Sequence, residues 1–169
     1  MQQPRVKFPY GISNIEKLVE QNYVFVDKTK YVELLELDES YSIFLRPRRM
    51  GKSLFVSILE YYYDILEKDK FESIFSKLYI GQHPTPGANA YRVLKMDFSG
   101  IDTQTEEATY KYFLETIKST LYTFIGRYKL LDPHNTENIL NAGSPGSVMK
   151  NFFESLKLWK EKLSRLREM

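Results

Sequence analysis

The segment from Arg46 to Leu54 constrains the fold of this chain more than any other part of the sequence. It reads Arg-Pro-Arg-Arg-Met-Gly-Lys-Ser-Leu and follows an apolar run at residues 43–45. It matches the second half of the P-loop pattern, in which Gly-x-x-x-x-Gly-Lys-Ser/Thr joins a buried strand to a helix. Arg46 stands where that pattern has its first glycine. The segment therefore predicts a phosphate-binding turn between a strand and a helix.

Each residue that the pattern retains has a chemical task. Gly51 permits a positive φ and a close approach of the backbone, so that successive N–H groups can curl around a phosphate. Lys52 can reach the β- and γ-phosphates, and the hydroxyl of Ser53 can ligate the Mg²⁺ that bridges them. The sequence thus predicts a site for ATP and Mg²⁺. The expected nucleotide-binding residues are Arg46, Pro47, Arg48, Arg49, Met50, Gly51, Lys52, Ser53 and Leu54.

The flanking segments occur in the order that such a site requires. Residues 41–45 are mostly apolar and rich in β-formers, which predicts a buried parallel strand. An amphipathic stretch of helical length begins at Lys52. The fold class that we expect is therefore α/β, a partial P-loop NTPase fold with parallel strands flanked by helices. An ordinary strand–turn–helix corner with solvated arginines would explain the glycine, but not the lysine and the serine together.

The loop concentrates positive charge in a chain whose net charge is only +2. A triphosphate matches this field, because the arginine fork suits phosphate oxygens. A nucleic-acid backbone matches it too, although 24 basic against 22 acidic residues argue against a dedicated nucleic-acid binder. The alternative to ATP binding is thus a non-enzymatic module that contacts nucleic acid or a partner protein through the arginine-rich loop.

The loop and the region before it resemble the AAA-ATPase-like domain of bacterial and archaeal proteins, whose loop reads Arg-Pro-Arg-Arg-Phe-Gly-Lys-Ser or close to it. Met50 replaces the phenylalanine. The likeness includes residues 10–18 and 23–32, and it is weaker at residues 91–101. It implies that the absent first glycine is typical of the group. Many members also carry a C-terminal nuclease-like domain of the PD-(D/E)xK kind, of which this sequence shows no sign.

The resemblance also implies a later strand that ends in a Leu-Ile-Asp-Glu-Tyr-Asp type of motif and supplies the Walker B carboxylates. No such segment precedes Met169, so we expect either the N-terminal portion of a longer protein or a shortened relative, and in both cases poor hydrolysis of ATP. Asp97, near the end of a second predicted strand at residues 91–98, is a candidate Mg²⁺ ligand in a degraded Walker B strand. Alternatively, Asp97 or Asp102 caps the next helix.

We expect one domain over residues 1–169, with a lead-in segment at 1–40, the strand, loop and helix at 41–66, and a mostly helical part at 103–169. Within the lead-in segment, the sequence predicts helices at residues 12–21 and 28–37. Ser13 and Glu16 match a capping box for the first of these. Asp27 either caps the second or lies near the nucleotide.

The remaining features concern the compartment and partners. The chain has no cysteine, no apolar signal core and no run of roughly 18 apolar residues, so we expect a cytoplasmic protein without a membrane partner. The sequence indicates no oligomeric state. The last predicted helix, at residues 148–166, is basic and amphipathic, and a continuing chain or a partner would cover its apolar face.

Overall fold

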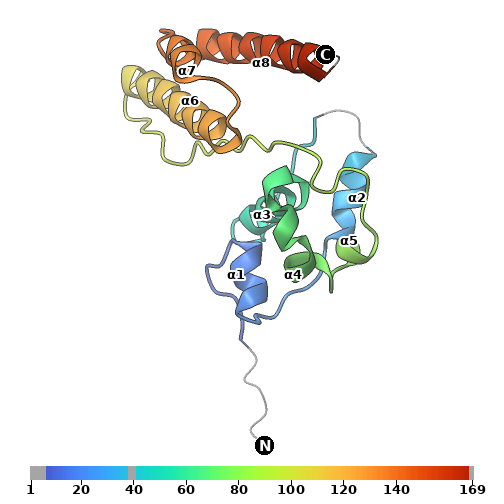
Figure 1. Cartoon of the computed structure of the whole chain (residues 1–169). Helices are drawn as coiled ribbons and strands as arrows, with labels where there is room; N and C mark the ends of the chain where they lie inside the picture. Colours follow the sequence, from blue (N-terminus) through green and yellow to red (C-terminus); the bar gives the residue numbers. More distant parts are fainter. Residues whose placement is uncertain (1–6, 38–40, 168–169) are drawn as a thin grey trace, which may run out of the picture. The chain divides into compact units, whose positions relative to one another are not determined.

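The computed structural model describes the backbone of residues 7–37 and 41–167, and the side chains within these ranges as far as Lys160. Every regular element in this part of the chain is a helix (Figure 1). The chain divides into two compact units, Met1–Val93 and Leu94–Met169. Each unit has a buried apolar core of its own, so the two are described separately.

The described residues of unit 1 contain the predicted loop and six short helical elements. Its core forms where α3 meets α4, around the buried rings of Tyr62 and Phe75, whose centroids lie 5.7 Å apart in an edge-on arrangement. The helix α1 packs on α3 and α4, and α2 packs on α5. The elements are α1 (Ile15–Glu20), α2 (Lys30–Glu36), α3 (Lys52–Tyr63), the 3-10 helix η1 (Ile65–Lys70), α4 (Phe71–Phe75) and α5 (Tyr79–Gln82).

In unit 2 the described helices are α6 (Glu106–Tyr128), α7 (Pro133–Leu140) and α8 (Pro145–Arg167), which pack against one another (Figure 1). The side chain of Thr105 caps α6 by accepting a hydrogen bond from the backbone N–H of Ala108. The apolar stripe of α6 is buried at Leu121 and Phe124, which pack against Phe152 of α8 and its neighbours. The apolar residues at helical spacing in α6 therefore form part of the core of unit 2.

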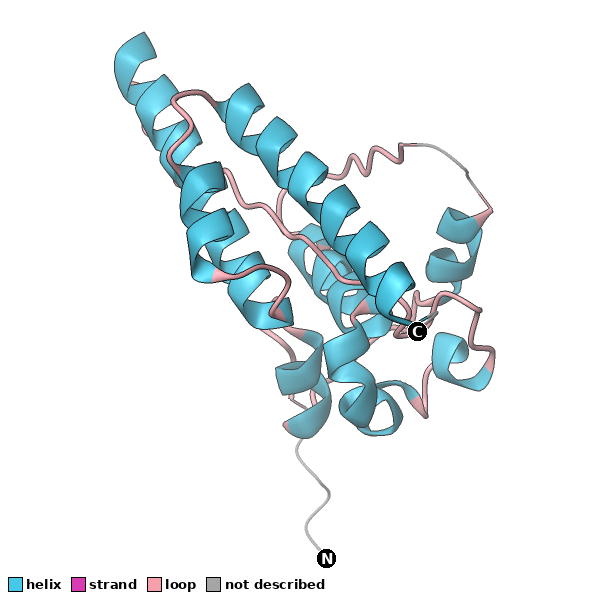
Figure 2. Cartoon of the chain, turned by 45° about the horizontal axis from the view of Figure 1, so that its top comes forward, coloured by secondary structure: helices cyan, strands magenta, loops and turns pink. Residues whose placement is uncertain are grey.

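The expected α/β fold class is wrong. Neither residues 41–45 nor residues 91–98 form a strand (Figure 2). The described residues contain only two isolated bridges, Lys7 with Tyr23 and Asp64 with Tyr91. A strand exists only as part of a ladder of hydrogen bonds with a neighbour. The apolar pattern predicted burial of residues 41–45, but Tyr41 is 98% exposed and Ile43 is 82% exposed.

The second predicted strand differs from the first in that part of it is packed against a core. Its apolar residues Leu94 and Met96 pack against the helical core of unit 2, and the ring of Phe98 lies 5.2 Å from that of Phe113 on α6. The alternation of apolar residues predicts a strand within a sheet. In the structure it marks an irregular segment that covers helices.

The predicted helices were more accurate. The apolar repeat at residues 106–128 predicts a long helix, and α6 has these bounds, whereas α8 begins at Pro145 rather than at residue 148. The predicted capping box is wrong, because Asn14, and not Ser13, caps α1 by accepting from the N–H of Lys17. Within the described residues, no helix combines the length and the apolar character needed to cross a bilayer.

Candidate functional site

The loop before α3 contains two left-handed residues. Gly51 has a φ of 79° and Arg49 has a φ of 64°. The positive φ expected at Gly51 is thus present, and a Cβ added there would meet no atom within 4 Å. The conformation, and not lack of space, is what requires glycine at this position. Left-handed residues in a tight loop turn successive backbone N–H groups toward one side, as in an anion-binding nest.

The first turn of α3 continues this concave arrangement. Its hydrogen-bond ladder begins with the N–H of Phe55, which donates to the carbonyl of Gly51 at 2.9 Å. The N–H groups of Lys52, Ser53 and Leu54 precede this ladder, so they face outward at the positive end of the helix dipole. No side chain of the N-cap residue satisfies them, because that residue is Gly51. These amides are directed to where an anion would sit.

Lys52 holds its ammonium group against the loop itself. Its Nζ donates to the backbone carbonyl of Arg46 at 2.5 Å and to that of Pro47 at 3.4 Å. The loop therefore curls around the lysine side chain. The ammonium group of Lys52 therefore lies beside the backbone of the arginine-rich loop.

Aromatic contacts attach the start of the loop to α3. The ring of Phe44 stacks on that of Phe55, with centroids 5.1 Å apart and an interplanar angle of 29°. The guanidinium of Arg46 lies over the Phe44 ring, with its Cζ atom 5.6 Å from the centroid. Arg48 and Arg49 are exposed, so two guanidinium groups remain accessible on the loop.

An apolar pocket of about 440 Å³ adjoins the loop. The lead-in segment contributes one part of its lining, including Val24, Phe25 and Val26, with Lys28 and Tyr31 beside them. The loop contributes Phe44, Arg46, Met50 and Gly51, and α3 contributes Leu54, Phe55 and Ile58. Gly51 and Arg46 are therefore part of both the loop and the pocket lining.

The lead-in segment is fixed in place by hydrogen bonds to α5. The carboxylate of Asp27 accepts from the N–H and the hydroxyl of Thr29 and from the N–H of Tyr79. The Thr29 hydroxyl also accepts from the N–H of Ile80, at 3.1 Å. Asp27 thus caps α5 and not the helix that directly follows it. Its hydrogen bonds position the segment that lines the pocket.

Asp97 is engaged locally. Its carboxylate accepts a 2.9 Å hydrogen bond from the N–H of Ser99, and this bond holds the pKa of Asp97 below its usual range. It belongs to unit 2, whereas Ser53 belongs to unit 1. Neither Asp97 nor Asp102 caps α6, because Thr105 does so. Among the described residues, no cluster of three or more His, Asp or Glu side chains forms a metal site.

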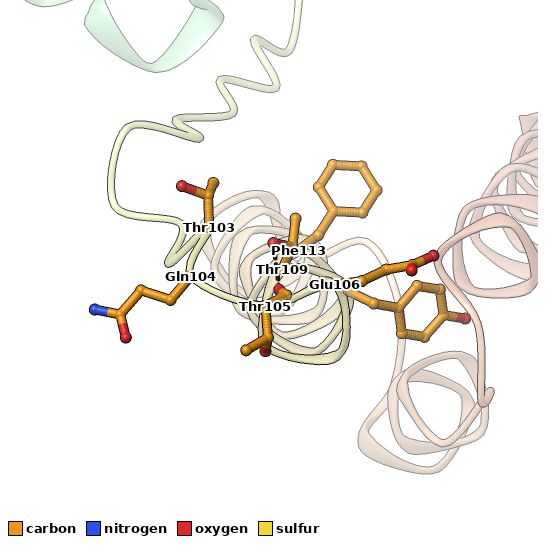
Figure 3. Close-up of a pocket in the computed structure, with 7 residues that line it drawn as sticks. Thr103, Gln104, Thr105, Glu106, Thr109 and Phe113 are labelled. Carbon is orange, nitrogen blue, oxygen red and sulfur yellow. Dashed lines mark hydrogen bonds between the residues drawn. The ribbon is translucent and has the colours of Figure 1, made fainter.

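A second pocket, of about 480 Å³, lies at the start of α6 (Figure 3). Its hydroxyl groups serve the helix: Thr105 caps it, and the Thr109 hydroxyl donates to the Thr105 carbonyl at 2.8 Å. The remaining labelled residues at its wall include Gln104 and Phe113. These two hydrogen bonds stabilise the N-terminal end of α6, and they point to no ligand.

Comparison with known proteins identifies the family. The model of the AAA-ATPase-like family, described as predicted AAA-ATPases, matches residues 9–166. The chain therefore belongs to this family, and the match includes the lead-in segment from residue 9, the loop, α6, α7 and α8 as far as residue 166. Searches of curated proteins and of solved structures gave no match.

The sequence interpretation missed most of the pocket. It named the loop residues, but not Phe25, Tyr31 or Phe55. No spacing rule connects these residues, because they come together only when the lead-in segment folds beside α3. The one available signal was that the family likeness includes residues 23–32, well before the loop.

Proposed function

We propose that this chain binds Mg-ATP through residues 46–54. The observation that carries the proposal is the left-handed Gly51 at the start of α3, with the Lys52 ammonium held by the carbonyls of Arg46 and Pro47. Outward-facing amides and a fixed cation favour a phosphate chain. Membership of a family of predicted AAA-ATPases supports the same assignment.

The other loop residues would complete the phosphate site. Arg48 and Arg49 are exposed and can present their planar guanidinium groups to phosphate oxygens. Ser53, the second residue of α3, has an exposed side chain, so its hydroxyl can reach a Mg²⁺ held by the nucleotide. Asp97 is the weaker candidate for this metal, because its carboxylate already accepts from Ser99. Bound Mg²⁺ would neutralise charge on the phosphates.

Hydrolysis requires more than this loop supplies. Turnover needs a group that positions or activates the attacking water. Neither residues 46–54 nor the described residues that line the adjoining pocket include a carboxylate. We therefore propose a protein that binds ATP and that, in the form of this chain, turns it over slowly.

Nucleotide titration tests the binding proposal. A ribose-labelled fluorescent ATP analogue with Mg²⁺ is titrated into the chain, the Lys52→Met variant and the Lys77→Met variant. Lys52→Met keeps an unbranched stem but removes the charge, and exposed Lys77 is the matched control. Loss of a charged hydrogen bond, worth roughly 1.5–3 kcal/mol, predicts binding weaker by about tenfold or more for Lys52→Met alone. Equal affinities for all three proteins would refute the proposal.

The same titration, repeated with a DNA or RNA oligonucleotide, tests the alternative function. Exposed Arg48 and Arg49 would also suit a polyanion. Salt-dependent oligonucleotide binding that ATP does not displace would favour a nucleic-acid module. Competition between the two ligands would mean that both use the same loop.

A further inference from the structure

We infer that the apolar pocket beside the loop holds the purine base of the bound nucleotide. This inference rests on the proposed function, because it assigns the end of the ligand that the phosphate loop does not contact. The pocket volume of about 440 Å³ lies within the range of small-molecule sites.

Continuity between the pocket and the loop is the first argument. Arg46, Met50 and Gly51 belong to the loop and also line the pocket. A ligand whose anionic end lies on the amides of Lys52 and Ser53 therefore has the pocket directly beside it. A nucleoside triphosphate has this combination of a charged end and a planar apolar end.

The chemistry of the lining is the second argument. Aromatic side chains from three parts of unit 1, namely Phe25, Phe44 and Phe55, take part in the lining. Aromatic rings bind bases by stacking, which contributes roughly 1–3 kcal/mol per base. Lys28 and Arg46 are the only charged side chains among the described residues that line the pocket, so no anion there repels the phosphates.

The lining also predicts how bases are discriminated. Among its described residues, the hydroxyl of Tyr31 is the one neutral polar side-chain group, so side chains offer few hydrogen bonds to the edge of a base. Stacking depends on the area of the ring system and tolerates changes at its edge. ATP should consequently bind tighter than CTP, and much tighter than inorganic triphosphate.

A competition experiment separates this inference from the phosphate site. ATP, CTP and inorganic triphosphate, each with Mg²⁺, displace the fluorescent ATP analogue from the whole chain and from three variants. Tyr31→Ala removes a half-exposed ring of the pocket, and Leu34→Ala removes an equally exposed side chain of α2 outside it; their exposures are 52% and 48%. Val26→Asp, at another exposed position, places a carboxylate in the pocket.

The expected result is that Tyr31→Ala weakens ATP binding by about tenfold, as loss of one stacking contact predicts. Val26→Asp should also weaken ATP binding, because its carboxylate would lie among apolar groups where the base binds and would repel the phosphates. Triphosphate binding to Tyr31→Ala and all binding to Leu34→Ala should stay at the wild-type level. Equal affinity of ATP and triphosphate for the wild-type chain would overturn the base pocket while leaving the phosphate loop intact. The same conclusion follows if Tyr31→Ala and Val26→Asp bind ATP as Leu34→Ala does. Failure of every ligand to bind would overturn both proposals.

Discussion

The carboxylate of Asp27 accepts a 2.7 Å hydrogen bond from the backbone N–H of Tyr79, which lies 52 residues further along the chain. The neighbouring Thr29 is fully buried, and its hydroxyl both donates to Asp27 and accepts from the N–H of Ile80. Side chains of the lead-in segment therefore cap α5. The Asp27-Lys28-Thr29 motif joins two distant parts of unit 1.

Replacing Asp27 should test this connection. Asp27→Ala leaves the N–H groups of Thr29 and Tyr79 without their acceptor, so we expect a loss of about 2 kcal/mol or more in the free energy of unfolding. Asp27→Asn keeps one side-chain oxygen and should lose less. Urea denaturation followed by far-UV circular dichroism measures both. The exposed Asp69 provides the control, since Asp69→Ala should change the stability by less than about 0.5 kcal/mol.

The hydrogen bonds of the Glu16 carboxylate predict that the stability of the fold depends on pH. The hydroxyl of Tyr61 donates to Glu16 at 2.6 Å, and Lys70 pairs with the same carboxylate at 2.9 Å. These two partners, Tyr61 first, lower the pKa of Glu16. A lowered pKa stabilises the folded state above the unfolded value of about 4.3, and this contribution is lost as the pH falls through the folded value.

Glu16→Gln should consequently destabilise the protein by about 1 kcal/mol at pH 7 and by much less at pH 3. Urea midpoints of both proteins across this range measure the difference. Glu20→Gln, at an exposed position of the same helix, should give a constant difference. A Glu16→Gln effect that stays the same at both pH values would show that Tyr61 and Lys70 do not stabilise the ionised carboxylate over the protonated one.

Two glycines should respond in opposite ways to alanine. A Cβ at Gly81 would overlap the backbone carbonyl of Phe75, and that carbonyl cannot move without shifting α4. Overpacking of this kind costs about 1–3 kcal/mol or more. Gly126 lies within α6, where an added Cβ meets no atom within 4 Å. Gly126→Ala should therefore stabilise unit 2 by roughly 0.5–1 kcal/mol.

Two spectroscopic signals can measure the effects of these substitutions on unfolding. Trp159 is the only tryptophan, and it packs against the core of unit 2. Its fluorescence should show a higher urea midpoint for Gly126→Ala, whereas Gly81→Ala should lower the midpoint seen by circular dichroism. A stabilising Gly81→Ala substitution would contradict the close approach of α5 to α4.

The sequence predicted those features of the fold that depend on neighbours along the chain. The helix Glu106–Tyr128 follows from a 3.6-residue repeat of apolar side chains, and a repeat is a local property. A strand depends on a partner that the pattern does not specify. Leu94 and Met96 show the result, because their alternation suits a sheet but they pack on helices.

The same distinction applies to the candidate site. The loop has a local signature, and the left-handed conformation of Gly51 follows from the need for a positive φ before the helix. The capping of α5 by Asp27 and the approach of Tyr31 to the loop depend on contacts between segments distant in sequence. The sequence therefore predicted the left-handed glycine of the loop, but not the apolar pocket beside it.

The hydrogen bonds from Lys52 to the carbonyls of Arg46 and Pro47 also bear on the thermodynamics of any anion that binds there. Fixing a lysine side chain costs roughly 1.5–2 kcal/mol of rotamer entropy. In this loop the fold already orders the Lys52 side chain. The rotamer entropy is therefore lost when the protein folds, and it is not lost again when an anion binds. The ammonium group is preorganised, so an anion that bound there would have a correspondingly higher affinity.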